Sequence, residues 1–480
     1  MSEQKKQWQS RLILILMLIF IAGSFIRLYP AAVSDKPLRY DTYYHVRVAE
    51  LIKETGSIPD FDPWPAGGRP HTYPPLYHIS LAVTSLLSGI PILEVSRFFL
   101  PILASLTIPV AFWLVRKFRD EKTALIAAFL LAISPYLISS SYESPQVIGL
   151  LLALPLAYFM INSKHLYSGM LISVIFLFNT FIALFLSAVI FIFLLSEKRF
   201  KAMAKTFWLP AVVLALFFLP RLDAFSCSNF WIGPFFISKS ADIWVKFVTP
   251  SFLAMVLIPI ALIKGKTDRY RRFWYAWVGL SIILFLSHYL TPIFHPWRQD
   301  SILMFGLVFF FAEAVSGKDK KRLLFLAVFA LASLFVLNSM YHSWLFDRPL
   351  TSNEYSLINY ISTMPQNVVP LANHDVCSNL MTLTNRSCLL DTNFECIPDA
   401  KKWYDYENFF WVRSPEQMRT ILSTYSVNTV AFAGGDWAQS VIVPLDVNKE
   451  YSAWLPNTPD ASLYEINIRH GNLSYYSERP

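Results

Sequence analysis

The chain has 480 residues, of which 55% are hydrophobic and only 15% are charged, and its formal net charge is +8. Its mean hydropathy of +0.42 is higher than a soluble chain of this length would tolerate. Composition therefore excludes an ordinary soluble enzyme. It predicts a polytopic α-helical membrane protein.

The first apolar run extends from Arg11 to Pro30 and follows Lys5 and Lys6. A signal peptide would show the same charge pattern, but this run is long and lacks a small-residue cleavage site. We therefore predict an uncleaved first membrane helix with the N-terminus in the cytoplasm.

Further apolar runs predict about eleven membrane helices in total, each near the roughly 20 residues that a bilayer requires. They lie near residues 98–115, 123–139, 146–161, 166–179, 181–196, 206–220, 246–263, 273–289, 300–315 and 322–340. The stretch 166–196 is interpreted as a hairpin of two helices. The weaker apolar segment 76–90 is predicted to lie on the membrane, within a long first external loop that covers residues 31–97.

Basic residues test this topology, because Lys and Arg are retained on the cytoplasmic side of short loops. Four basic clusters occur, at residues 116–122, 197–205, 264–272 and 317–322. With the helices assigned above, all four face the cytoplasm. If 76–90 crossed the membrane, or if 166–196 were one helix, at least one cluster would lie outside.

Residues 341–480 differ in kind from the transmembrane domain at 1–340, because they are polar and contain short β-like runs at 427–434 and 463–468. They predict a soluble external α/β domain. All the cysteines fall in segments predicted to be external, where disulfides persist, and their pairing stays open. These cysteines are Cys227, Cys377, Cys388 and Cys396, and two sequons begin at Asn385 and Asn472.

Three predicted external loops carry ionisable side chains at helix ends, so that one cavity at the outer leaflet could gather them. The first holds Asp41, the second Glu143 and the third Arg298. Carboxylates from separate loops can hold a hard divalent cation, and an arginine suits phosphate oxygens. Such a site fits a lipid-linked sugar donor, since sugar transfer needs charge stabilisation at the leaving phosphate.

The motif "YDTYYHVR" at 40–47 resembles the first acidic motif of the oligosaccharyltransferase catalytic subunits, including the single-chain archaeal and bacterial enzymes of the GT-C class. "DPW" and "YPPL" in the same loop, and the segments 124–144, 297–314 and 369–394, follow that family's order. The resemblance implies a GT-C-like fold, a polyprenyl-linked donor of dolichyl type and a divalent metal, Mn²⁺ or Mg²⁺.

The resemblance also implies roles for individual residues. Asp41 matches the acidic residue that contacts the metal and the acceptor amide, and Glu143 falls at the acidic pair of the second loop, so both are expected to be catalytic metal ligands. Arg298 matches the arginine that engages the donor phosphate. Asp375 falls at the aspartate of the family's Trp-Trp-Asp-Tyr-Gly signature, where His374 replaces the second tryptophan, and these two are expected to bind the acceptor.

Local interpretations remain open beside these roles. Asp41 could cap a helix that starts at Thr42, and Arg298 could extend to lipid headgroups. The function expected is transfer of a sugar or oligosaccharide to an acceptor at the outer face, either protein asparagine or another molecule such as a glycan or lipid. The partners expected are the donor, the acceptor and membrane lipid, with no nucleic acid. The alternatives are an inactive relative that binds lipid-linked glycan, or a transporter, although charges hardly occur in mid-helix.

Overall fold

The computed structural model describes residues 3–34, 41–65, 68–143, 145–221, 267–290 and 296–316, and beyond these only short stretches, of which 374–388 is the longest. The chain divides into two compact units. The helical unit consists of Met1–Leu38, Pro74–Pro220 and Ile232–Asp347. The mixed unit, which contains helices and strands, consists of Arg39–Tyr73, Arg221–Trp231 and Arg348–Pro480.

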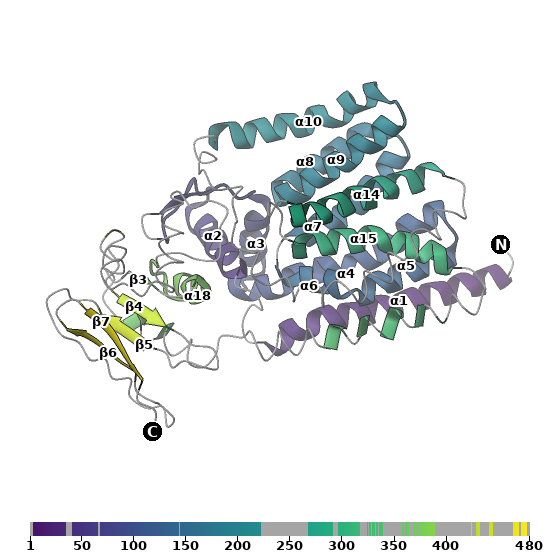
Figure 1. Cartoon of the computed structure of the whole chain (residues 1–480). Helices are drawn as coiled ribbons and strands as arrows, with labels where there is room; N and C mark the ends of the chain where they lie inside the picture. The colour runs from purple at the N-terminus through teal and green to yellow at the C-terminus, as the bar shows by residue number, and fades with distance from the viewer. Residues whose placement is uncertain are drawn as a thin grey trace. The chain divides into compact units, whose positions relative to one another are not determined.

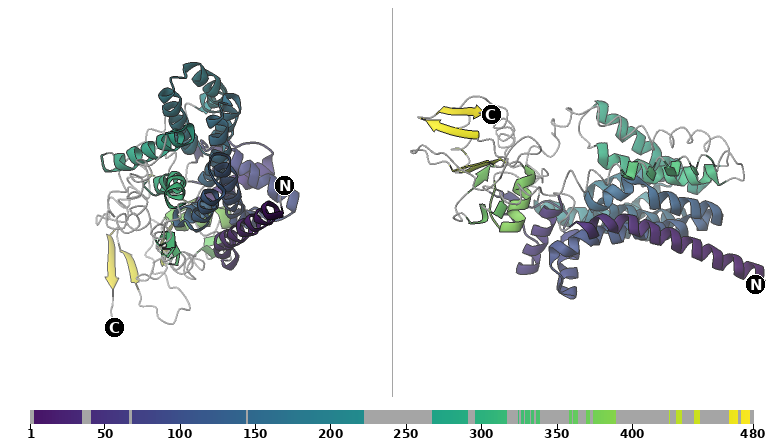
Figure 2. Two further views of the ribbon diagram at one scale, coloured as in Figure 1. Left: turned by 90° about the vertical axis from the view of Figure 1, so that its right-hand side faces the viewer. Right: turned by 90° about the horizontal axis from the view of Figure 1, so that it is seen from below.

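The described helices of the helical unit pack against one another around an apolar core (Figure 1 and Figure 2). They are α1 (Glu3–Val33), α3 (Leu76–Ser88), α4 (Ile92–Phe118), α5 (Glu121–Ile133), α6 (Pro135–Glu143), α7 (Gln146–Ile161), α8 (His165–Phe178), α9 (Thr180–Ser196), α10 (Phe200–Phe218), α14 (Arg269–Leu290) and α15 (Pro296–Val315). A short 3₁₀ turn, Leu219–Arg221, follows α10. The predicted helix at 246–263 lies outside the described residues, and the one at 322–340 is described only at scattered helical positions between 324 and 338.

Three described helices are long and apolar enough to cross a membrane by themselves, namely Gln7–Val33, Ile92–Phe118 and Phe200–Phe217. A fourth span results if α5 and α6 count as one bent helix. Other apolar helices in the described ranges, α7 and α9 among them, have 10–17 residues. The number of eleven spans therefore stays a prediction, as does the external position of the C-terminal residues.

The predicted single helix at 123–139 is in fact two helices, α5 and α6, bent by 53° at Ser134. The cause is Pro135, which has no backbone N–H to donate to the carbonyl of Leu131. The fully buried guanidinium of Arg27, on α1, donates instead to Leu131 O at 2.6 Å and to Ala132 O at 2.9 Å. The sequence pattern does not indicate this contact, because Arg27 lies inside an otherwise apolar run.

Replacing Arg27 by Met is expected to lower the free energy of unfolding by at least about 2 kcal/mol, since it leaves two buried carbonyls without this donor. Arg11→Met on the same helix is the matched control, because Arg11 is exposed. Thermal unfolding of the detergent-purified proteins measures the difference. Equal transition midpoints for the two variants would contradict the bridging role of Arg27.

The predicted helical hairpin at 166–196 is present as α8 and α9, which pack against each other. Asn179 separates them, with an extended backbone at φ −158° and ψ 107°. Its side chain accepts a hydrogen bond from the backbone N–H of Ile182 at 3.0 Å and so caps α9. One N-cap residue therefore ends the first helix and starts the second.

Three of the four predicted cytoplasmic clusters meet in an ion-pair network at one end of the helices. Arg119, after α4, pairs with Asp268 before α14 at 2.8 Å and with Glu313 near the end of α15. Arg269 pairs with Glu197, after α9, at 2.8 Å. These contacts fit the predicted topology, which puts the same helix ends on one side of the membrane.

Asp268 illustrates how this network is held. Burial alone would raise its pKa, but hydrogen bonds from Arg119 and from the backbone N–H of Arg271 outweigh burial and lower the pKa below its usual value. The network therefore contributes stability above the ordinary pKa of an aspartate, and this contribution is lost as the pH falls through the lowered pKa.

Aromatic packing joins α14 to α15 at the core of the helical unit. The ring of Trp274 stacks on Phe309 with the centroids 3.9 Å apart, and Trp277 Nε1 donates to the carbonyl of Ile302 at 2.8 Å. Gly306 makes this approach possible, because an added Cβ would lie 2.4 Å from the Trp277 ring. The middle of α15 is thus fixed against α14.

The mixed unit combines two described helices with short strands (Figure 1). The helices are α2 (Asp41–Thr55) and α18 (His374–Thr384). The strands are β1 (Phe61–Asp62), β2 (Arg69–Pro70), β3 (Pro370–Leu371), β4 (Thr429–Phe432), β5 (Val441–Pro444), β6 (Tyr464–Arg469) and β7 (Asn472–Ser477). β3 is parallel to β4, and β4 is antiparallel to β5, while β6 and β7 form a hairpin. The β-like runs predicted at 427–434 and 463–468 are therefore present as β4 and β6.

Candidate functional site

Asp41 is the first residue of α2 and is half-buried. A carboxylate in the first turn is stabilised by the partial positive charge of the helix N-terminus. The helix therefore begins one residue earlier than the local capping interpretation predicts. Glu50 lies roughly 13 Å further along the helix axis. Burial is the main cause that raises the pKa of Glu50, and the negative charge of Glu54 raises it further. Asp41 is thus remote from Glu50 along the helix.

A buried ion cluster fixes α2 to the loop that follows it. Asp62 accepts hydrogen bonds from Arg47 of α2 at 3.1 Å and from Arg69 of β2 at 2.8 Å, and all three side chains are at most 3% exposed. The guanidinium of Arg47 also lies 5.0 Å from the centroid of the Trp64 ring. Buried charges of this kind are stable only when paired and hydrogen-bonded, so the cluster holds α2 to β1 and β2.

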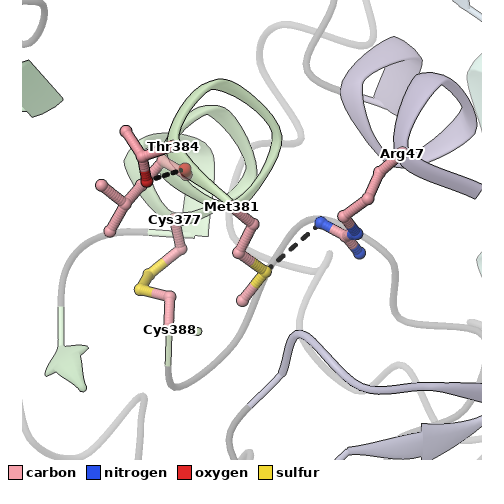
Figure 3. Close-up of a disulfide and its surroundings, with 6 residues drawn as sticks. Arg47, Cys377, Met381, Thr384 and Cys388 are labelled. Carbon is pink, nitrogen blue, oxygen red and sulfur yellow. Dashed lines mark hydrogen bonds between the residues drawn. A yellow bond between two sulfur atoms is a disulfide. The ribbon is translucent and has the colours of Figure 1, made fainter. Parts of the chain in front are cut away.

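The same loop contacts the segment 377–388, more than 300 residues away in the chain. Arg47 Nη1 donates to Met381 Sδ at 3.3 Å (Figure 3), and Thr382 Oγ1 donates to the carbonyl of Tyr43 at 3.0 Å. Trp64 Nε1 donates to Asn385 Oδ1 at 2.5 Å. α18, which begins with His374 and Asp375, is therefore held against α2, which begins with Asp41.

A disulfide between Cys377 and Cys388 closes the segment that contains most of α18 (Figure 3). The other two cysteines, Cys227 and Cys396, lie outside the described residues. The backbone N–H of Cys388 donates to the carbonyl of Trp64 at 3.3 Å, so the disulfide also ties this segment to the first loop. This disulfide agrees with the prediction that disulfides persist in this part of the chain.

Replacing Cys377 and Cys388 together by alanine is expected to destabilise the mixed unit by about 3 kcal/mol, the chain entropy lost on closing a loop of this length. Thermal unfolding measures the loss. The double variant of α2 residues Lys53→Ala and Glu54→Ala, both exposed, is a control that should unfold like the unmodified protein. A midpoint unchanged by removing the disulfide would contradict this account.

The helical unit brings two of the predicted site segments together. Glu143 is the last residue of α6, and Arg298 is the third residue of α15. α15 packs against α6, and the buried Gln146 Nε2, at the start of α7, donates to Ser301 Oγ of α15 at 2.6 Å. The backbones that carry Glu143 and Arg298 are therefore neighbours, while their side chains lie outside the described residues.

The predicted metal can be compared with the residues that would hold it. Among the residues that the structure describes, no group of three or more His, Cys, Asp or Glu side chains is arranged to hold a metal ion. Asp41 and Glu143 supply carboxylate oxygens, the ligands that Mg²⁺ and Mn²⁺ prefer. The side chains of Glu143, His374 and Asp375 lie outside the described part, so metal and acceptor binding stay proposals.

Sequence reasoning missed the residues that hold the candidate segments together. Asp62 and Trp64 belong to the "DPW" motif, and this motif was the only sequence feature that pointed to them. Gln146 and Ser301 are 155 residues apart, and no pattern in one sequence pairs them.

Comparison with known proteins identifies the class to which this arrangement belongs. Residues 12–237 match the model of the family "Oligosaccharyl transferase STT3, N-terminal". The chain is 33% identical over 101 residues to dolichyl-phosphooligosaccharide-protein glycotransferase 1 of Archaeoglobus fulgidus, a match that covers 20% of this chain and only 17% of that relative. The matched part is thus a small fraction of the curated relative.

Solved structures share the fold. The archaeal oligosaccharyltransferase AglB from Archaeoglobus fulgidus, in complex with an inhibitory peptide and a dolichol-phosphate, superimposes with a TM-score of 0.64 at 13% identity, over 90% of this chain and 70% of that one. ArnT from Cupriavidus metallidurans, bound to undecaprenyl phosphate, gives a TM-score of 0.57 at 13% identity, over 92% and 98% of the two chains. The chain therefore shares the fold of these proteins, and with its apolar helices it is a helical membrane protein.

The family model, the archaeal relatives and the shared fold together show that the chain is a GT-C oligosaccharyltransferase-like protein. The sequence-based resemblance is thereby confirmed.

Proposed function

We propose that this protein is a membrane glycosyltransferase that transfers a sugar or oligosaccharide from a polyprenyl phosphate or diphosphate donor to an acceptor at the external membrane face. The observation that carries the proposal is the bond between Gln146 and Ser301. The bond joins Gln146, three positions after Glu143, to Ser301, three positions after Arg298. A carboxylate and an arginine at neighbouring helix ends suit a phosphorylated lipid whose tail remains in the membrane.

The similar proteins support a lipid-linked donor. One solved relative holds a dolichol-phosphate and the other undecaprenyl phosphate. The inhibitory peptide in the first supports a peptide acceptor, and protein asparagine is therefore the first acceptor to test.

Each candidate residue has a proposed task. Arg298 would bind the donor phosphate through two parallel hydrogen bonds. Asp41 and Glu143 would hold a divalent metal, Mn²⁺ or Mg²⁺, which when bound supplies positive charge against the leaving phosphate. His374 and Asp375, at the start of α18, would orient the acceptor.

The proposed topology follows the basic clusters. The N-terminus and the ion-pair network of Arg119, Asp268 and Glu197 would lie in the cytoplasm. Residues 1–340 would form the multi-pass transmembrane domain, and residues 341–480 a domain outside the membrane.

The altered signature favours one alternative. Asn373 and His374 stand where the family has two tryptophans. An inactive relative that binds lipid-linked glycan would have this substitution and keep the donor residue Arg298.

Transfer by the purified protein in nanodiscs tests these alternatives. The assay combines a labelled polyprenyl-linked glycan extract with a sequon peptide and a total-lipid acceptor pool, with Mn²⁺ or with EDTA. Metal-dependent labelling of the peptide is the expected result. Labelling of the lipid pool alone would keep the enzyme class and change the acceptor. Donor binding without transfer would contradict the proposed activity and favour the inactive relative.

A further inference from the structure

One carboxylate in the mixed unit holds several structural elements at once. Asp62 Oδ2 accepts hydrogen bonds from Arg47 Nη2 at 3.1 Å, from Arg69 Nε at 3.0 Å and from Arg69 Nη2 at 2.8 Å, while Oδ1 accepts from the backbone N–H of Trp64 at 3.3 Å. The carboxylate is 2% exposed. It therefore connects α2, β2 and the turn at Trp64 within a region shielded from water.

The same interactions extend from Asp62 to α18. Arg47 bonds Asp62 through Nη2 and Met381 through Nη1, so the two contacts require one orientation of the guanidinium. The turn at Trp64 contacts the far end of α18 through Asn385, and Tyr44 packs under the guanidinium of Arg69, 5.4 Å from its ring centroid. The fork of an arginine fixes direction as well as distance, so Arg47, held by Asp62, helps to orient α18 relative to α2.

We propose that Asp62 is a positioning residue for sugar transfer: through Arg47 it orients α18, whose first residues are His374 and Asp375, relative to α2, whose first residue is Asp41. The expected change in acceptor kinetics rests on the proposed function. The structural coupling between Asp62 and α18 does not depend on it. Asp62 itself touches neither donor nor acceptor in this scheme. Loss of Asp62 would displace the proposed acceptor-binding residues of α18 without replacing them.

The variant Asp62→Asn keeps the shape of the side chain and removes its charge, so two buried guanidiniums lose their shared counter-charge. A displaced α18 weakens acceptor binding, whereas the donor arginine, Arg298, is on α15 of the helical unit. We expect kcat/KM for the acceptor to fall on the order of 10- to 100-fold, mostly through KM, with the donor KM changed less than about twofold. Simple loss of folded protein would lower apparent kcat and leave both KM values unchanged.

The control is Glu54→Gln, which removes an exposed carboxylate from α2 and should behave like the unmodified protein. A milder second variant is Met381→Leu, which removes the sulfur that accepts from Arg47 Nη1 with little change of volume. It should raise the acceptor KM in the same direction by a smaller factor. If Asp62→Asn yields no folded protein, Met381→Leu decides, and an unchanged acceptor KM in that variant overturns the proposal.

Hydrogen–deuterium exchange of the α18 amides separates this proposal from the proposed function. We expect exchange in residues 377–384 to increase at least about tenfold in Asp62→Asn while exchange in α14 and α15 stays the same. Amide exchange can be measured even if the unmodified protein transfers no sugar. In that case the proposed function would be wrong, and the coupling between Asp62 and α18 would still be supported. Unchanged exchange in α18, or equal changes in donor and acceptor KM, would overturn the positioning role.

Discussion

Replacing Asp41 by Asn is expected to lower sugar transfer at least about 100-fold while the protein stays folded. Asn caps a helix about as well as Asp does, so the substitution preserves the local role that a residue at the start of α2 can have. It removes only the negative charge that would hold the metal. The variant therefore separates catalysis from capping.

Initial rates of transfer in nanodiscs, measured over a range of Mn²⁺ concentrations, check this prediction. Glu54→Gln removes an exposed carboxylate from the same helix and should transfer at the normal rate. If Asp41→Asn transferred sugar normally with unaltered metal dependence, Asp41 would be only a helix-capping residue.

Arg298→Gln is expected to weaken donor binding about 10- to 100-fold, the loss that follows from removing charged hydrogen bonds to a phosphate. Arg298→Lys distinguishes this role from simple attraction to the membrane. A lysine extends to lipid headgroups as well as an arginine does, but it cannot form two parallel hydrogen bonds to one phosphate. We therefore expect the lysine variant to be intermediate.

Donor binding is measured with a labelled polyprenyl-linked glycan and the detergent-purified variants, without any acceptor. Arg271→Lys, in the ion-pair network, serves as the matched arginine control, because it keeps a positive charge near Glu313. Full donor affinity in Arg298→Lys would instead support a headgroup contact for Arg298.

Local sequence patterns predicted the helical framework well, because apolar run length and capping residues act within a few positions. α7 begins and ends at the predicted residues, and Asn179 divides α8 from α9 where a hairpin was expected. The bend between α5 and α6 was missed although Pro135 is visible in the sequence. Proline alone does not show whether a helix bends or ends, and here the partner that stabilises the bend, Arg27, comes from another helix.

The sequence predicts the candidate site as a set of residues, whose roles stay predictions, and not as an arrangement. The motif resemblance indicated Asp41 and Arg298, but no spacing rule predicts that Arg47 meets Met381 or that Gln146 meets Ser301. Such contacts depend on tertiary packing between segments far apart in the chain. The sequence did not indicate the role of Asp62 for the same reason, since that role depends on the two arginines that Asp62 binds.

The most direct test of the account is release of labelled sugar from its polyprenyl carrier by the purified protein in nanodiscs, followed as loss of label from the lipid fraction. We expect release that requires an acceptor and a divalent metal, stops with EDTA and is lost in Asp41→Asn. Label that stays on the carrier under every condition, although the donor binds, would contradict the claim that this protein is a glycosyltransferase.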